Sequence, residues 1–465
     1  MPLSFEQLAA SCVGVDTTVP VLGGGRRRYV NLDNAATTPA LRPVQEAVDR
    51  FLPHYSSVHR GAGYKSLVST EVFDRCRRRV AAFVGASLDH ATVIFGKNTT
   101  EMVNKLSRRL KVEEGDLVLL SAVEHHSNDL PWRKAARVVR LPVDRRGALD
   151  LDQLETQLRA HAGRIKIIAV SGASNVTGHQ AKIHEIAALA HRHGARILAD
   201  CAQLAPHRAI DVRSPDDPGH LDFVVFSAHK MYAPYGIGVL VGPREFFDGS
   251  EPDHVGGGTV ELVTASTAHW APTPDRDEPG TPNLLGAVAL ARAIGCLMEV
   301  GFEAIANHER ALTSYALKRL REVPGIELYG DVAPVPGEDR IGVIPFNLQG
   351  LHHSLLASAL SWEGGIGVRS GCFCAHPFIQ QLLGIPESAE PDLLARVLAK
   401  DRSRLPGLVR MSFGLFNTEA DVDVVVEKLS EFAHDGVRGL YHFSDSYGEY
   451  LAEGCQVDVD PLLGI

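Results

Sequence analysis

Lys230 has the most suggestive position of the reactive side chains in this sequence. It closes the run Ser227-Ala228-His229-Lys230, which directly follows the apolar segment 223–226. A lysine at the end of a buried strand is partly desolvated, which lowers the pKa of its amine and suits it to Schiff-base formation or proton transfer. Because most lysines are solvated loop charges, the interpretation depends on the residues that accompany Lys230.

Two pairs of residues could serve a ring and a phosphate beside this amine. Asp200 offers a carboxylate to a protonated pyridine nitrogen, and Gln203 could donate a hydrogen bond to a ring hydroxyl. Thr99 and Thr100 open a predicted helix, where free N–H groups and the positive end of the helix dipole favour phosphate. A lysine, a pyridine partner and a phosphate site are the groups that pyridoxal phosphate requires.

Four further polar residues could complete such a site. Ser227 and His229 could also bind the phosphate, because both closely precede Lys230 in the sequence. His125 follows its strand at a distance that would let it stack on the cofactor ring. Asn175 could hold a ring substituent or the substrate.

Each part of this set also has an ordinary alternative. Thr99 or Thr100 could be a helix N-cap, His125 a loop histidine with partners of its own, and Asp200 a turn or capping residue. One cofactor accounts for the whole set, whereas the alternatives need a separate explanation for each residue. The sequence therefore favours a pyridoxal phosphate site.

The elements that must position these residues alternate between strand and helix from about residue 90 to about residue 240. A helical apolar pattern over 182–193 stops at Gly194, and helices are also expected from Thr99 onward and over 284–300. This alternation predicts a largely parallel sheet with helices on both faces, which binds ligands beyond the carboxyl ends of its strands. The predicted strands are 92–95, 117–120, 165–170, 196–199 and 223–226.

The rest of the chain does not show this regular alternation of strands and helices. Residues 250–290 lack periodicity and read as a long loop, which is more often functional or interfacial than idle. Short strands are expected over 341–348 and 409–413, and they indicate a second, smaller domain.

Ten segments resemble the cysteine desulfurase and selenocysteine lyase family, in the class-V aminotransferase group of fold-type I pyridoxal phosphate enzymes. They follow the family's order and cover about residues 29–430. The resemblance implies an α/β fold with a mostly parallel seven-stranded sheet and a smaller C-terminal α+β domain. The segments are Leu32–Pro39, Val58–Gly61, Asn98–Asn104, Glu124–Trp132, Ser174–Gly178, Asp200–Gln203, Ser227–Gly238, Gly280–Asn283, Arg369–Pro377 and Arg410–Thr418.

The same resemblance suggests a division of the chain. A large cofactor-binding domain is expected over residues 31–295 and a small domain over 296–465, which ends in an extension from about residue 444. Residues 1–30 would pack with the small domain.

The resemblance implies a role for each residue that matches the family's motifs. Lys230 resembles the Schiff-base lysine, Asp200 the pyridine partner, Gln203 the contact to the ring oxygen and His125 the stacked imidazole. The phosphate ligands of one subunit would be Thr100, Ser227 and His229, with Thr281 lent by the other subunit of a homodimer. Arg410 resembles the bidentate clamp for the substrate carboxylate, and Asn175 would contact the same substrate.

Cys374 matches the sulfur-accepting cysteine of this family. Many members have two histidines before it, whereas this chain has Cys372 and Phe373, which looks more like the molybdenum cofactor sulfurases. Arg369 and His376 could lower the pKa of the thiol. A structural or incidental Cys-x-Cys pair is the alternative, and a metal site is not expected because no second cysteine or histidine cluster supplies further ligands.

The expected reaction is the conversion of cysteine to alanine, with the sulfur retained on Cys374 as a persulfide for an acceptor protein. The alternatives on the same scaffold are a C–S lyase, a selenocysteine lyase, an aminotransferase or an epimerase, none of which needs Cys374. A catalytically silent protein that binds a sulfur-transfer partner is a third possibility. The acidic extension with Cys455 could be a docking element or a dangling tail.

Composition excludes other classes of protein. The 465 residues are 45% hydrophobic and 22% charged, with a formal net charge of −9, as in an ordinary globular protein. The basic runs 26–28 and 77–79 are too short for a nucleic-acid footprint, and both are expected on solvated faces. Neither a leader nor a membrane span is expected. Seven scattered cysteines favour a reducing compartment, so we expect a cytoplasmic protein.

Overall fold

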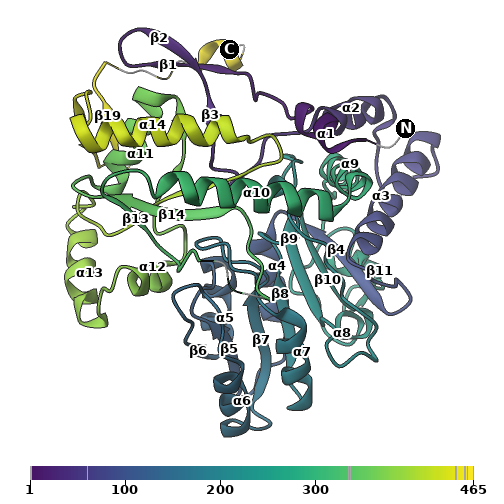
Figure 1. The fold of residues 1–465 in the computed structure, drawn as a ribbon. Helices are drawn as coiled ribbons and strands as arrows, with labels where there is room; N and C mark the ends of the chain where they lie inside the picture. The colour runs from purple at the N-terminus through teal and green to yellow at the C-terminus, as the bar shows by residue number, and fades with distance from the viewer. Residues whose placement is uncertain are drawn as a thin grey trace.

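A seven-stranded sheet lies at the centre of the larger part of the molecule (Figure 1). In the strand order β4-β10-β9-β8-β7-β5-β6, β10 is antiparallel to both its neighbours and the remaining pairs are parallel. The carboxyl ends of β4, β5, β7, β8 and β9 therefore meet at one edge. The strands are β4 (Ala91–Gly96), β5 (Leu117–Ser121), β6 (Arg137–Leu141), β7 (Ile165–Ser171), β8 (Arg196–Asp200), β9 (Phe223–Ser227) and β10 (Gly238–Pro243).

Helices cover both faces of this sheet, as the sequence predicts. Alternate residues of β4 face opposite ways, so that Val93 packs into one core and Ile94 into another. The predicted helix over 182–193 is α7, which ends before Gly194 at a φ of +74°. The helices on the first face are α2 (Arg42–Phe51), α3 (Tyr64–Phe83), α6 (Leu151–Ala160), α7 (Ile183–Arg192) and α9 (Leu284–Val300), and those on the second are α4 (Thr99–Arg109), α5 (Leu130–Ala135) and α8 (Arg244–Asp248).

A second, four-stranded antiparallel sheet has the order β13-β14-β17-β16 and a core of its own. The strands expected over 341–348 and 409–413 are β14 and β17. Its strands are β13 (Ile326–Leu328), β14 (Val343–Leu348), β16 (Arg369–Gly371) and β17 (Leu408–Ser412), packed with α10 (Phe302–Leu320), α11 (His353–Gly364) and α14 (Glu419–Asp435).

The structure, a computed structural model, describes residues 3–59, 61–333, 335, 337–445, 448–454, 457 and 459–463. Arg60, Cys455 and part of the predicted extension from residue 444 lie outside the described residues. The remaining elements are α1 (Phe5–Ala10), β1 (Thr18–Val21), β2 (Gly25–Arg28), β3 (Val30–Asn31), β11 (Val260–Val263), β12 (Ala268–Trp270), β15 (Ile366–Gly367), α12 (His376–Leu382), α13 (Glu390–Leu398), β18 (Tyr441–Ser444), β19 (Glu449–Ala452) and α15 (Asp460–Leu463).

The N-terminal segment contacts both parts of the molecule. Leu8 of α1 is buried in the core of the large sheet, whereas the N–H of Leu22 donates to the carbonyl of Trp362 in α11 at 2.7 Å. The domain boundaries at residues 30 and 295 stay a prediction.

Two sequence-based expectations are wrong. Residues 250–290 are not one unstructured loop, because β11 and β12 form an antiparallel hairpin within them. Arg77 is not solvated: its guanidinium lies in the core, bonds to Glu278 at 2.8 and 3.1 Å and packs on Phe73. Glu278, whose carboxylate compensates the charge of Arg77, lies in the C-terminal half of the segment 250–290.

Among the described residues, no single helix is long and apolar enough to span a membrane. Only α9 and α10 taken together reach that threshold, and they are bent by 77°.

Candidate active site

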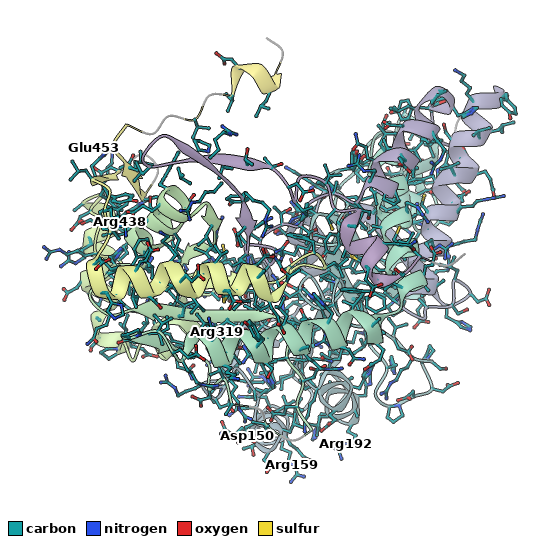
Figure 2. The ribbon with its side chains drawn as sticks, turned by 45° about the horizontal axis from the view of Figure 1, so that its top comes forward. Asp150, Arg159, Arg192, Arg319, Arg438 and Glu453 are labelled. Carbon is teal, nitrogen blue, oxygen red and sulfur yellow. The ribbon has the colours of Figure 1, made fainter. Side chains whose placement is uncertain are left out.

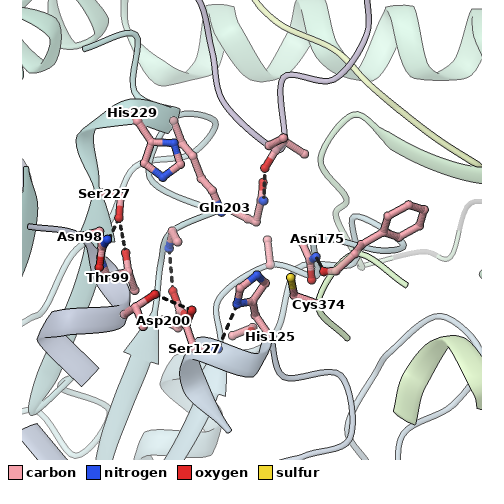
Figure 3. A pocket seen from close by; sticks show the side chains of 18 of the residues that line it. Asn98, Thr99, His125, Ser127, Asn175, Asp200, Gln203, Ser227, His229 and Cys374 are labelled. Atoms are coloured by element: carbon pink, nitrogen blue, oxygen red, sulfur yellow. Dashed lines mark hydrogen bonds between the residues drawn. The ribbon is translucent and has the colours of Figure 1, made fainter. Parts of the chain in front are cut away.

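A cavity of about 260 Å³ opens at the carboxyl edge of the large sheet (Figure 3). It brings together every site residue predicted from the sequence except Thr281, which is exposed and does not line it. The predicted residues that line the cavity are Thr99, Thr100, His125, Asn175, Asp200, Gln203, Ser227, His229, Lys230, Cys374 and Arg410.

Lys230 is the last residue of the short 3-10 helix (Ala228–Lys230) that follows β9, and it lines the cavity. Burial lowers the pKa of Lys230 to about 8, and the charge of Asp200 partly opposes that shift. An amine with this pKa is partly neutral near neutral pH, whereas a solvated lysine is almost wholly protonated. Lys230 can therefore act as a nucleophile or a base.

Asp200 ends β8 and is itself buried. Its Oδ1 accepts a hydrogen bond from the N–H of Ala202 at 3.0 Å, and burial raises its pKa. A carboxylate with so little hydrogen bonding is stabilised in its ionised form by a cationic partner. A protonated pyridine nitrogen would supply that partner.

His125 is held as a neutral ring beside Lys230. The N–H of Ser127 donates to His125 Nδ1 at 3.1 Å, which assigns the ring proton to Nε2. Burial, together with the charges of Lys230, His126 and Arg410, lowers the pKa of His125 to about 3. A neutral, flat imidazole in the cavity wall is suited to stacking on an aromatic cofactor.

The first turn of α4 also lines the cavity, through Thr99 and Thr100. Asn98 is the N-cap of this helix, because its side chain accepts from the N–H of Glu101 at 3.0 Å, so the capping role considered for Thr99 or Thr100 is wrong. Thr99 instead bonds through its N–H and its hydroxyl to Ser227 Oγ at 2.8 and 2.6 Å.

Three other residues of this region, Asn98, Ser127 and Gly238, were not predicted as site residues. Thr100 Oγ1 lies 2.7 Å from Ser127 Oγ, which places Ser127 on the cavity wall. Gly238 passes so close to Asn98 that a Cβ on it would lie 2.4 Å from the Asn98 carbonyl carbon. The N-cap signal of an asparagine before two threonines could have identified Asn98.

Arg410 comes from β17 of the small sheet and reaches the same cavity. Its Nη2 donates to Asp33 at 3.0 Å, its Nη1 donates to the carbonyl of Asn175 at 3.0 Å, and its guanidinium lies over the ring of Phe373. The Nε of Arg410 is buried without a partner among the described residues. Arg410 therefore has a hydrogen-bond donor that the described residues leave unused.

Cys374 is exposed on a loop held from two sides. Asn175 Nδ2 donates to the carbonyl of Phe373 at 2.7 Å, and the N–H of His126 donates to the carbonyl of Cys374 at 2.8 Å. Phe373 and Cys374 have φ angles of +49° and +56°, in the left-handed region that costs energy for residues other than glycine. These contacts keep the thiol at the cavity mouth.

The neighbours of Cys374 differ in their orientation. Arg369 lines the cavity, whereas His376 Nδ1 lies 3.0 Å from His126 Nε2, with the two rings stacked. Cys372 donates to the carbonyl of Pro406 at 3.3 Å, and burial raises its pKa to about 11. Cys372 is therefore a poor nucleophile, and Cys374 is the thiol that faces the cavity.

The residues present fit pyridoxal phosphate. Lys230, the under-bonded Asp200, the neutral His125 and Gln203 could hold the ring, although the amide nitrogen of Gln203 already donates to Ala35 at 2.7 Å. The turn of α4 could hold the phosphate. A mostly parallel sheet with this lysine and carboxylate at its carboxyl edge defines a fold-type I pyridoxal phosphate enzyme.

The chain belongs to the aminotransferase class-V family, whose pattern matches residues 30–425. It is 34% identical over 411 residues to a probable cysteine desulfurase of Halalkalibacterium halodurans, which covers 86% of this chain and 92% of that protein. It is 35% identical over 416 residues to a probable cysteine desulfurase of Halobacterium salinarum, with coverages of 88% and 92%.

Solved structures agree with this assignment. The apo cysteine desulfurase of Thermococcus onnurineus NA1 superposes with a TM-score of 0.75 at 32% identity, over 87% of this chain and 94% of that one. A cysteine desulfurase of Escherichia coli has a TM-score of 0.75 at 28% identity, with coverages of 92% and 98%. The predicted fold class and family are confirmed.

Proposed function

We propose that the protein is a pyridoxal phosphate-dependent cysteine desulfurase that converts L-cysteine to L-alanine and retains the sulfur on Cys374 as a persulfide. The observation that carries the proposal is that Lys230 and Cys374 line the same cavity. The names of the relatives support the same reaction.

Substrate binding and proton transfer follow from the cavity residues. When bound, pyridoxal phosphate supplies an electron sink for the carbon that carries the substrate's amino group. Arg410, which lines the cavity, binds the substrate carboxylate. Lys230 Nζ takes up the proton from the α-carbon, which a pKa of about 8 permits.

Cys374 then accepts the sulfur. Its thiolate attacks the substrate sulfur, an S–S bond forms and the Cβ–S bond breaks. The electron pair stays on the β-carbon, which takes a proton to give alanine. The enzyme keeps a persulfide on Cys374, which an acceptor protein would collect from the cavity mouth, where the residue is exposed.

Substitution of Cys374 tests the proposal. With cysteine as substrate, Cys374→Ala is expected to lose alanine formation, whereas Cys372→Ser, which keeps a donor for Pro406, is expected to retain it. If Cys374→Ala forms alanine at the wild-type rate, or if the wild type forms pyruvate in place of alanine, one of the alternative reactions that does not use Cys374 is correct.

We also propose that the enzyme acts as a homodimer. Thr281 lies outside the cavity of its own chain, although its segment, Gly280–Asn283, matches the family. A second copy would bring this threonine to the phosphate end of the partner's cavity.

A further inference from the structure

The C-terminal hairpin contacts the strand that leads into the loop carrying Cys374. Strands β18 and β19 pair in antiparallel fashion, beyond residue 425, where the family match ends. Figure 1 places β19 beside α11 in the small-sheet part of the molecule. The hairpin thus lies outside the segment that matches the family pattern.

Three contacts fix the hairpin along α11. Near the end of the helix, Glu363 accepts from the Tyr441 hydroxyl at 2.9 Å. At the middle, Ser358 Oγ donates to the carbonyl of Tyr450 at 2.7 Å. At its start, the buried Ser354 donates to the carboxylate of Glu449. The hairpin is therefore positioned along the whole helix.

Glu449 also reaches the strand that leads into the Cys374 loop. The hydroxyl of Ser370 donates to its carboxylate, with Oγ to Oε distances of 3.0 and 3.1 Å. Ser370 is the middle residue of β16, the edge strand that pairs with β17. Side chains alternate along a strand, so Ser370 points away from the face on which its neighbour Arg369 lines the cavity.

The carboxylate of Glu449 is well placed for this contact. It lies at the first turn of α11, where the helix dipole favours a negative charge. One carboxylate thus joins the start of a helix to the back of the strand that leads into Cys374. The left-handed backbone at Phe373 and Cys374 needs such support, because surrounding contacts must compensate its cost.

We propose that Glu449 is a positioning residue for the Cys374 loop and that the paired strands β18 and β19 serve to hold this loop in its reactive arrangement. The proposal rests on the desulfurase function, because it assigns the hairpin to the step in which Cys374 meets the substrate sulfur.

The test compares Glu449→Ala with Glu449→Gln and with Glu453→Gln. Glu453 is an exposed residue at the end of the same hairpin (Figure 2), so its substitution removes the same charge without touching the loop. Glu449→Ala is expected to lower kcat for alanine formation from cysteine by about tenfold, the effect of losing one charged hydrogen bond. Glu449→Gln keeps an acceptor oxygen and should recover most of the rate, and Glu453→Gln should match the wild type.

Two further readouts separate positioning from general damage. Turnover of β-chloroalanine, whose chloride leaves without help from a thiol, should stay within about twofold of wild type in Glu449→Ala. Amide hydrogen exchange in residues 370–375 should be faster in Glu449→Ala alone. Equal loss with both substrates, or unchanged exchange and kcat, overturns the proposal. Failure of the desulfurase function itself would look different, because the wild type would then release no alanine from cysteine.

Discussion

Asn175 Nδ2 donates a hydrogen bond of 2.7 Å to the backbone carbonyl of Phe373. This bond joins the loop after β7 of the large sheet to the residue that precedes Cys374. The sequence resemblance gave Asn175 the role of a substrate contact. Its position also makes it a support for the cysteine loop, and the two roles have different kinetic consequences.

We expect Asn175→Ala to lower kcat for cysteine by about tenfold with a smaller change in KM, because a buried carbonyl loses its donor and the loop loosens. Steady-state kinetics with cysteine give both constants. Asn307→Ala, on the exposed side of α10, is the control and should leave both unchanged. A raised KM with an unchanged kcat would identify Asn175 as a substrate contact alone.

The strand ends of the large sheet could be predicted because each is a local pattern, an apolar run followed by a polar residue. That rule found Thr99, His125, Asp200 and Lys230, and the parallel sheet brings them together. The antiparallel direction of β10 could not be read in this way, because apolar runs carry no direction.

Ion pairs between segments that lie far apart in the sequence could not be predicted either. Asp33 meets Arg410 across 377 residues, and Arg77 meets Glu278 across 201. A charged residue looks the same in sequence whether its partner is water or a buried carboxylate. For that reason Arg77 was placed on the surface and Asp33 received no role, although it lies in a segment that resembles the family.

Lys230 should be the residue that captures the cofactor. After incubation with pyridoxal phosphate and reduction with borohydride, peptide mapping is expected to find the adduct on Lys230. Lys230→Ala should lose both the adduct and about a thousandfold in kcat, as expected when a catalytic base is removed. Lys97→Ala, an exposed lysine at the same sheet edge, should retain both.

The reaction of Lys230 with added pyridoxal phosphate should depend on pH. Only the neutral amine reacts, so the rate should rise as the pH increases through about 8 and then level off. Asp200→Asn should move the midpoint to lower pH, because the charge of Asp200 raises the pKa of Lys230. Stopped-flow absorbance measures this rate. A midpoint near that of a solvated lysine would contradict the buried position of Lys230.

Thr281 offers a test of the proposed homodimer. Thr281→Ala should weaken retention of pyridoxal phosphate if the residue reaches the partner's cavity. In dimers mixed from Thr281→Ala and Lys230→Ala chains, the cavity with an intact lysine receives its threonine from the Lys230→Ala chain. Such mixtures should therefore be more active than either variant alone. Absence of recovery in dimers verified by native mass spectrometry would place Thr281 outside the partner's site.

Glu124, beside His125, should make the stability of the fold depend on pH. Its carboxylate is buried and accepts from Asn128 at 2.7 Å and from the N–H and hydroxyl of Ser171 at 3.0 and 2.7 Å. Burial nevertheless raises its pKa to about 7, because desolvation outweighs these bonds. The folded protein therefore holds a proton that the unfolded chain releases near its ordinary, lower pKa. The stabilisation that protonated Glu124 contributes is fully present below that lower pKa. It is lost as the pH rises through the pKa of the folded state, about 7.

A neutral glutamine at position 124 removes this dependence. Between about pH 5 and about pH 8, the free energy of unfolding of the wild type should fall relative to that of Glu124→Gln by about 2–3 kcal/mol. Urea unfolding of both proteins across this range measures the difference, with Glu261→Gln on the exposed hairpin as the control. A difference that stays constant with pH would mean that Glu124 is ionised throughout, with its hydrogen bonds outweighing the cost of burial.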